Sequence, residues 1–143
     1  MPVLTPSGVP AGFEPIPTRG QFTDLNGPIW RQTEPFGTPA RLGFLPEARH
    51  TNTLGFVHGG RLSTVLDSAM AHVAHNRFQC RLVTLSLNLT FHHAVFKGRW
   101  ADISVEFTEQ SDTLIGMKAS LTARKSVCVS AVAEYRLFPS SKA

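Results

Sequence analysis

The sequence predicts an α+β fold, with one long helix packed on an antiparallel sheet of about six strands. Apolar residues recur at the helical period in one stretch, residues 62–73, and alternate with polar residues at period two in four later stretches. Such alternation predicts a sheet with a single apolar face, and the helix is the element available to cover it. At 143 residues the chain is long enough for one domain with a single core.

The prolines and glycines of the N-terminus predict an arm, residues 1–28, in front of a single domain at residues 29–143. Five prolines and three glycines fall within the first 20 residues, and prolines at this density exclude a regular helix or a central strand. We expect an extended arm with one short helical turn near residues 21–26. The arm is either mobile or laid across the domain.

Two short strands, at residues 29–34 and 40–45, are expected before the helix, with a turn at residues 35–39 between them. The helix has an apolar stripe made of Leu62, Val65, Leu66, Ala69, Met70 and Val73. Beside it runs a second stripe of small residues and one acid, made of Gly60, Ser63, Asp67, Ala71 and Ala74. Small side chains let another surface approach closely, so both faces are expected to be buried. Asn76 is the expected end of the helix.

Four strands are expected after the helix, in the stretches 83–91, 101–107, 115–123 and 127–137. In the first of them the apolar side chains, Leu87 included, share one face, and Thr84 lies on the opposite, polar face. The breaks between the stretches are short, at residues 97–99, 110–112 and 124–126. Short breaks predict that consecutive strands are antiparallel neighbours.

The charge and cysteine content disfavours several classes of protein. The formal charge is +4 and the basic residues are scattered, so nucleic-acid binding is not expected, whereas an anionic small molecule would suit the chain. Cys80 and Cys128 form no CxxC pair or His/Cys cluster, which argues against a metal site and a disulfide scaffold and favours a reducing, cytoplasmic location. We expect no membrane span and no signal peptide, because neither pattern of apolar residues occurs.

The candidate site is the segment from Asn52 to Gly60 together with Asp67. The His58-Gly59-Gly60 turn presents backbone amides at the start of the helix, where unpaired N–H groups and the positive end of the helix dipole can hold a developing negative charge. Glycine lets such an amide approach a ligand closely. Asp67 stands on a helix face expected to be buried, and a buried carboxylate without a partner is costly.

This pattern of Asn52, Gly55, His58-Gly59-Gly60 and Asp67, followed by four alternating stretches, resembles the hotdog-fold acyl-CoA thioesterases. It is most similar to the branch that includes the phenylacetate-degradation thioesterases and the Arthrobacter-type 4-hydroxybenzoyl-CoA thioesterases. The resemblance covers residues 29–138. It implies hydrolysis of an acyl-CoA thioester without a metal or a cofactor, since coenzyme A is part of the substrate. It also implies a homodimer, often assembled further into a homotetramer, with two composite sites between paired sheets.

The resemblance implies a role for each residue of the pattern. The Gly59 amide polarises the thioester carbonyl, and Asp67, reaching across from the partner subunit, acts on the carbonyl carbon or on a water as nucleophile or general base. Thr84 helps to place that water or the acid, and Asn52 and His58 shape the loop around the thioester. Candidates for holding coenzyme A are Gly60, Arg61, Lys97, Arg99, Arg124 and Lys125.

Each of these residues also has a purely structural interpretation. Asp67 could be a solvated helix residue, although its neighbours on the helix are small rather than charged, and Gly59 could belong to a tight turn only. His58 is either a general base or, as we favour, a residue whose hydrogen bond stabilises the loop. Asn52 could be a turn or cap residue, and Thr84 is common in strands. No metal-ligand pattern accompanies the histidine pairs His72/His75 and His92/His93.

The chain departs from the family pattern in two places. Arg61 follows the His-Gly-Gly turn where relatives often carry an apolar residue, and the last hairpin has Arg124-Lys125-Ser126 instead of a glycine. Arg61 therefore leaves the acyl group of the substrate open. The rival hypothesis is a hotdog domain that binds acyl-CoA without turning it over. A hydratase or dehydratase ranks last, because the His/Asp spacing it needs is missing.

Overall fold

The computed structural model describes residues 8–17, 20–32 and 41–139. Its sheet has seven strands, with every neighbouring pair antiparallel, in the order β1-β2-β3-β5-β6-β7-β4. The strands are β1 (Phe13–Pro15), β2 (Trp30–Gln32), β3 (Leu42–Phe44), β4 (Arg81–Phe91), β5 (Ala101–Gln110), β6 (Leu114–Ala123) and β7 (Ser126–Phe138). The predicted α+β class is confirmed, with one strand more than expected. The expected turn at residues 35–39 lies outside the described residues.

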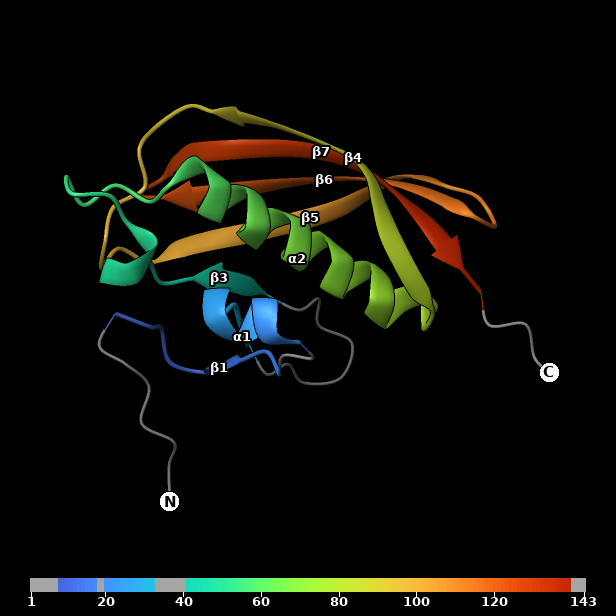
Figure 1. Ribbon diagram of the computed structural model, residues 1–143, viewed down its shortest axis with the longest axis horizontal. Helices are drawn as coiled ribbons and strands as arrows, with labels where there is room; N and C mark the ends of the chain where they lie inside the picture. Colours follow the sequence, from blue (N-terminus) through green and yellow to red (C-terminus); the bar gives the residue numbers. More distant parts are fainter. Residues whose placement is uncertain (1–7, 18–19, 33–40, 140–143) are drawn as a thin grey trace, which may run out of the picture.

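One long helix, α2 (Gly59–Phe78), runs along one face of the sheet (Figure 1). The predicted apolar stripe is buried except for Val73, which is half-buried, and it packs on inward side chains of the long strands such as Met117 and Leu121. The helix ends two residues beyond Asn76, because Gln79 takes the left-handed conformation (φ 53°) and its N–H donates to His75 O (2.8 Å). Within the described ranges, no helix is long and apolar enough to cross a membrane.

The prediction that consecutive strands are neighbours is right for β5, β6 and β7 but wrong for β4 and β5. β4 pairs with β7 and forms one edge of the sheet, while β5 pairs with β3 and β6. The reason is the link between β4 and β5: all of residues 92–100 lie outside the named strands, which is enough chain to cross the end of the sheet (Figure 1). The link passes close to the start of α2, where Val57 N–H donates to Val95 O (2.8 Å).

A β-bulge in β4 changes which side chains face the helix. The register with β7 shifts between Thr84 and Ser86, and an extra residue in one strand reverses the alternation of its side chains. Leu82 packs against the core before the bulge and Leu87 does so after it. The prediction that placed Thr84 on the face opposite to Leu87 is therefore wrong, and the Thr84 hydroxyl reaches α2.

The described part of the N-terminal arm is laid across the domain, which was one of the two expected alternatives. β1 pairs with β2 at the other edge of the sheet and adds the seventh strand, and an edge is where a proline-containing strand is tolerated. The helical turn predicted at residues 21–26 is confirmed as α1 (Gln21–Asn26). The guanidinium of Arg49 donates hydrogen bonds to the backbone oxygens of Leu25 and Gly27, which ties the arm to the loop before α2.

Candidate active site

The start of α2 presents backbone amides that have no partner inside the helix. The first intrahelical donor is Leu62 N–H, which donates to His58 O (3.0 Å), so the amides of Gly59, Gly60 and Arg61 come before it. His58 is the N-cap residue, and its side chain makes no capping hydrogen bond to these amides. A Cβ on Gly60 would meet nothing within 4 Å. Gly59 and Gly60 are exposed, so the start of α2 has the unpaired, uncovered amides that the sequence predicts for a site that holds negative charge.

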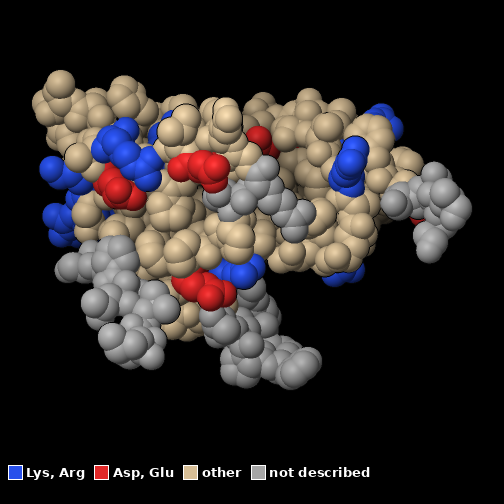
Figure 2. All heavy atoms as spheres, turned by 60° about the horizontal axis from the view of Figure 1, so that its bottom comes forward, with Lys and Arg blue, Asp and Glu red and all other residues tan. Residues whose placement is uncertain are grey.

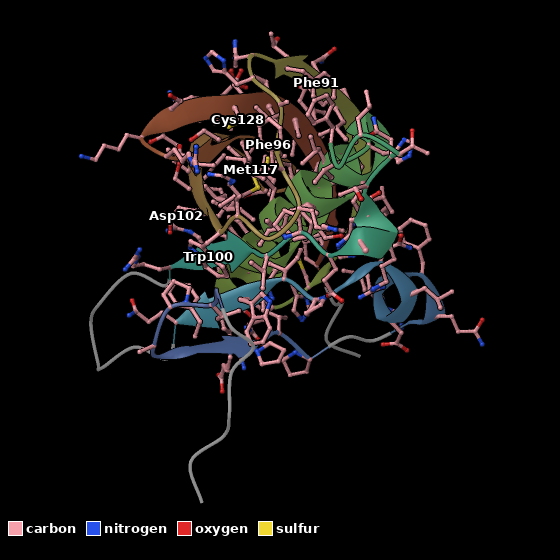
Figure 3. The ribbon with its side chains drawn as sticks, turned by 90° about the vertical axis from the view of Figure 1, so that its left-hand side faces the viewer. Phe91, Phe96, Trp100, Asp102, Met117 and Cys128 are labelled. Carbon is pink, nitrogen blue, oxygen red and sulfur yellow. The ribbon has the colours of Figure 1, made fainter. Side chains whose placement is uncertain are left out.

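Phe91, the last residue of β4, lies beside Gly59. A Cβ on Gly59 would stand 3.3 Å from Phe91 Cζ. Figure 3 looks onto this end of the molecule and shows Phe91 at the end of its strand, next to the start of α2. The ring is half exposed, with 52% of its surface accessible. The Gly59 amide thus has an aromatic wall at its side.

Asn52 organises the loop that leads into α2. Its side-chain Oδ1 accepts hydrogen bonds from the N–H groups of Leu54 (2.9 Å) and Phe56 (3.1 Å). Gly55, inside this turn, has a φ of +84°, which favours glycine. His58 N–H donates to His50 O (3.1 Å) at the end of the loop. These bonds agree with the loop-shaping interpretation of Asn52, and they give His58 a backbone role in the same loop.

Asp67 is half-buried, and two hydroxyl groups hold its carboxylate. Thr84 Oγ1 donates to Asp67 Oδ1 (2.9 Å), and Tyr135 Oη donates to the same oxygen (2.8 Å). The hydrogen bond from Thr84 is possible because the bulge in β4 lets Thr84 face the helix. Tyr135 was missed by the sequence analysis, although a tyrosine among the inward residues of a strand needs a partner for its hydroxyl. Burial, and then the charge of Asp67, raise the pKa of the Tyr135 phenol, so the phenol stays protonated as a donor.

Gly59 and Asp67 do not meet within one chain. They are eight residues apart on the same helix, which corresponds to roughly 12 Å along its axis. The sequence analysis assigned Gly59 and Asp67 of different subunits to one reaction, and that assignment does not require the two groups of one chain to meet. One subunit alone cannot bring both groups to one carbonyl.

The candidate residues for binding coenzyme A lie in different environments. Lys97 is exposed and Arg99 half-buried on the link between β4 and β5, at the end of the molecule where α2 begins, and Lys97 N–H donates to Gly55 O (3.0 Å). Arg124 and Lys125 form the turn between β6 and β7, both with positive φ (52° and 66°). Arg61 is buried, whereas a basic residue that binds coenzyme A was expected at the surface.

A buried polar pair, Arg61 and His50, stands beside the helix start. The guanidinium of Arg61 lies over the ring of Phe44, 5.1 Å from its centre. His50 Nδ1 accepts a hydrogen bond from Glu47 N–H (2.9 Å), and burial, helped by the charges of Arg61 and Arg49, lowers the pKa of His50 to about 4. The sequence analysis did not single out His50, and no motif in the sequence marks it.

A cavity of about 1130 Å³ separates the arm from the outer side of α2. Arm residues such as Ile16 and Phe22 form one wall, and Thr64, Ser68 and Ala71 of α2 form the other. Of the small-residue stripe that the sequence predicts to be covered, Ala71 lines this cavity. Arg61 lines this cavity as well.

The histidine pairs and the two cysteines were the other candidates considered in the sequence. In the part of the chain that the structure describes, no three or more His, Cys, Asp or Glu side chains are grouped so as to hold a metal ion. His92 Nε2 lies 2.9 Å from Ser130 Oγ instead. Cys80 and Cys128 are buried and free. Basic and acidic side chains are interspersed on the face shown in Figure 2, and most of that face is formed by other residues.

A family model described as the thioesterase superfamily matches residues 54–130. A comparison with curated proteins finds no match. Among solved structures, the TT0310 protein from Thermus thermophilus is similar with a TM-score of 0.71 at 19% identity, over 85% of this chain and 100% of that one.

Two further solved structures show the same likeness. The E. coli PaaI protein from the phenylacetic acid degradation operon aligns with a TM-score of 0.64 at 15% identity, over 69% of this chain and 72% of its own. The smu.793 protein from Streptococcus mutans UA159, solved bound to acetyl CoA, aligns with a TM-score of 0.65 at 18% identity, over 69% and 80% of the two chains.

Proposed function

This chain belongs to the thioesterase superfamily, and we propose that it hydrolyses an acyl-CoA thioester to a free acid and coenzyme A. The family and the hotdog fold expected from the sequence are confirmed. The observation that carries the proposal is the start of α2, where the exposed Gly59 and Gly60 precede the first intrahelical donor and Phe91 lies beside Gly59. The solved relative with acetyl CoA supports the substrate class.

The proposed reaction uses the Gly59 amide to stabilise negative charge. Attack on a thioester carbonyl places the charge of the tetrahedral intermediate on the former carbonyl oxygen, and a backbone N–H at a helix start is a suitable donor for it. A preorganised donor of this kind contributes about 3–4 kcal/mol to catalysis. No side chain at Gly59 or Gly60 obstructs the approach.

Asp67 is the proposed general base or nucleophile. Its Oδ1 is fixed by the hydroxyls of Thr84 and Tyr135, and a fixed carboxylate is ready either to take a proton from water or to attack the carbonyl carbon. Both hydroxyls bond the same oxygen, so Oδ2 is the oxygen that remains for the reaction. Thr84 and Tyr135 act as positioning residues.

We propose that the working site is shared by two copies of the chain. Gly59 and Asp67 of one chain are separated by roughly 12 Å along α2. A two-fold axis, in contrast, can bring Gly59 of one copy to Asp67 of the other. β4 supports this arrangement because it is an edge strand of 11 residues, and Val83, Leu85 and Phe91 on it are exposed. A long apolar edge of this kind is normally covered by a partner.

The first test is free-thiol release from short aliphatic, long aliphatic and aryl acyl-CoAs, with Asp67→Asn alongside the unchanged protein. We expect turnover on at least one class and a loss of kcat by orders of magnitude in the variant, with the melting temperature nearly unchanged. An unchanged kcat in Asp67→Asn would refute the assigned role. Binding of acyl-CoA without any turnover would favour the rival, a non-catalytic binding module.

The shared site has a separate test in mixed dimers. Gly59→Val places a side chain against Phe91 and across the amide, and neither this variant nor Asp67→Asn is expected to be active alone. In a dimer of the two variants, one composite site has both defects and the other has none. Unfolding and refolding a 1:1 mixture is therefore expected to restore about a quarter of the activity of the unchanged protein. A mixture as inactive as its parts would place both residues in one subunit's site.

A further inference from the structure

Arg61 is a buried positive charge that makes no salt bridge within the described chain. Only 9% of its surface is accessible, and its Nε and Nη2 atoms have no hydrogen-bond acceptor among the described residues. The guanidinium instead lies over the face of Phe44, at 5.1 Å. Isolated charges are expensive to bury. A guanidinium held in this state is therefore ready to bind an anion.

The surroundings of Arg61 add to its positive potential. A small cavity of about 210 Å³ is lined by Arg61, Arg49, His50, His58, Gly60 and Thr64. Glu47 is the nearby acid, and it is already paired with Arg49 (3.4 Å). His58 and Gly60, at the start of α2, line this cavity, so the positive end of the helix dipole lies beside it. His50 is neutral near pH 7, because its pKa is lowered to about 4, so it adds no positive charge to this cavity.

We propose that Arg61 binds a carboxylate at the far end of the acyl group, so that the preferred substrate is the CoA monothioester of a dicarboxylic acid. This inference rests on the proposed thioesterase function and names its substrate class. Arg61 is two residues from Gly59, and it lines both the small cavity and the large one along α2. An acyl group whose carbonyl lies at Gly59 can therefore reach it.

The position of Arg61 favours an acyl carboxylate over a phosphate of coenzyme A. The long pantetheine arm separates the thioester from the phosphates, whereas Arg61 is close in sequence to the proposed oxyanion donor and buried. Phosphates of coenzyme A are better matched to exposed basic residues such as Lys97. The planar guanidinium also suits a carboxylate, which it can bind through two parallel hydrogen bonds.

The test compares acyl-CoAs of equal chain length that differ only at the far end. Glutaryl-CoA ends in a carboxylate and valeryl-CoA in a methyl group, and adipyl-CoA and hexanoyl-CoA form a second pair. We would measure kcat/KM on each pair for the unchanged protein, for Arg61→Met and for Arg61→Lys. Lys97→Met removes an exposed charge and is the control. Equilibrium binding of the matching non-hydrolysable thioethers is measured in parallel.

We expect the unchanged protein to prefer the carboxylate member by roughly ten- to a hundredfold, as for hydrogen bonds to a charged group. Arg61→Met should abolish or reverse the preference and Arg61→Lys should retain part of it. Lys97→Met should change both members of a pair alike. Arg61→Met is expected to fold, since it replaces a buried charge by an apolar side chain of similar length, and its melting curve checks this.

Equal rates on both members, or a preference that Arg61→Met leaves intact, would overturn the inference while the thioesterase function stands. If no thioester is hydrolysed, the proposed function fails, and the thioethers then decide about Arg61. A binding preference that disappears in Arg61→Met would support the carboxylate site even then. Thioethers that bind equally well would refute it.

Discussion

The neutral, buried His50 predicts that this protein loses stability between pH 6.5 and pH 4. Its side chain is only 4% accessible, and burial together with the charges of Arg61 and Arg49 lowers its pKa from 6.5 to about 4. In the unfolded chain, by contrast, His50 takes up a proton near its ordinary pKa. Acidification through this window therefore favours the unfolded state.

The sign and size follow from proton linkage. Between pH 6.5 and pH 4 the unfolded chain binds more protons at His50 than the folded protein does, so the free energy of unfolding rises with pH in this window. Each pH unit between the two pKa values, 6.5 and about 4, corresponds to about 1.4 kcal/mol, so His50 accounts for a loss of about 3 kcal/mol by pH 4. Above pH 6.5 the contribution no longer changes.

The assay is urea unfolding at fixed protein concentration at pH 7.5, 5.5 and 4, compared with the His50→Asn variant. Asparagine Oδ1 can still accept the Glu47 N–H but does not titrate, so the variant should start less stable and lose about 3 kcal/mol less on acidification. The comparison removes the contribution of the carboxylates and of the other histidines. Parallel losses in both proteins would refute the reasoning about His50.

Three further changes have defined expected outcomes. Arg61→Met should raise the free energy of unfolding by about 1–4 kcal/mol, as measured by the urea midpoint, because it removes a buried charge without a partner; a lower midpoint would mean that the charge is compensated. Tyr135→Phe should cost about 1.5–3 kcal/mol of stability through the lost hydrogen bond to Asp67, and it should lower kcat more than it raises KM; an unchanged kcat would remove Tyr135 from the positioning of the acid. Gly43→Ala would place a Cβ 1.9 Å from Trp100 Cζ2, so it should destabilise the protein by about 1–3 kcal/mol or more and alter tryptophan fluorescence, whereas an unaltered melting curve would show that the indole moves at no cost.

Local sequence patterns predicted the helix and the strands. The features that they did not predict depend on pairing between strands that are distant in the sequence. The helical period located α2, and alternation located β5, β6 and β7, because both patterns reflect burial on one face. The position of β4 at the sheet edge could not be predicted from the sequence. The polar break between β4 and β5 looks short, at residues 97–99, whereas the link in the structure includes all of residues 92–100. The sequence also gives no sign of the bulge after Thr84, because apolar and polar residues alternate through β4 without interruption.

The site could be predicted only where it depends on backbone conformation. The glycines of the His-Gly-Gly turn signal exposed amides by themselves, and Asp67 was noticed because of its small neighbours. Tyr135 comes from a strand 68 residues further along the chain, and its contact with Asp67 exists only after the sheet has formed. The burial of Arg61 depends on Phe44, which lies on β3.

Because Arg49 attaches the arm to the loop before α2, binding of a molecule in the cavity along α2 is coupled to how well the arm is ordered. The arm supplies one wall of that cavity, and its tie to the loop before α2 includes the hydrogen bonds from the Arg49 side chain. By thermodynamic reciprocity, a molecule that binds between arm and helix slows hydrogen exchange of the arm amides, and loosening the arm weakens that molecule's affinity by the same factor. Trimming or loosening residues before β2 therefore tunes affinity from outside the catalytic groups.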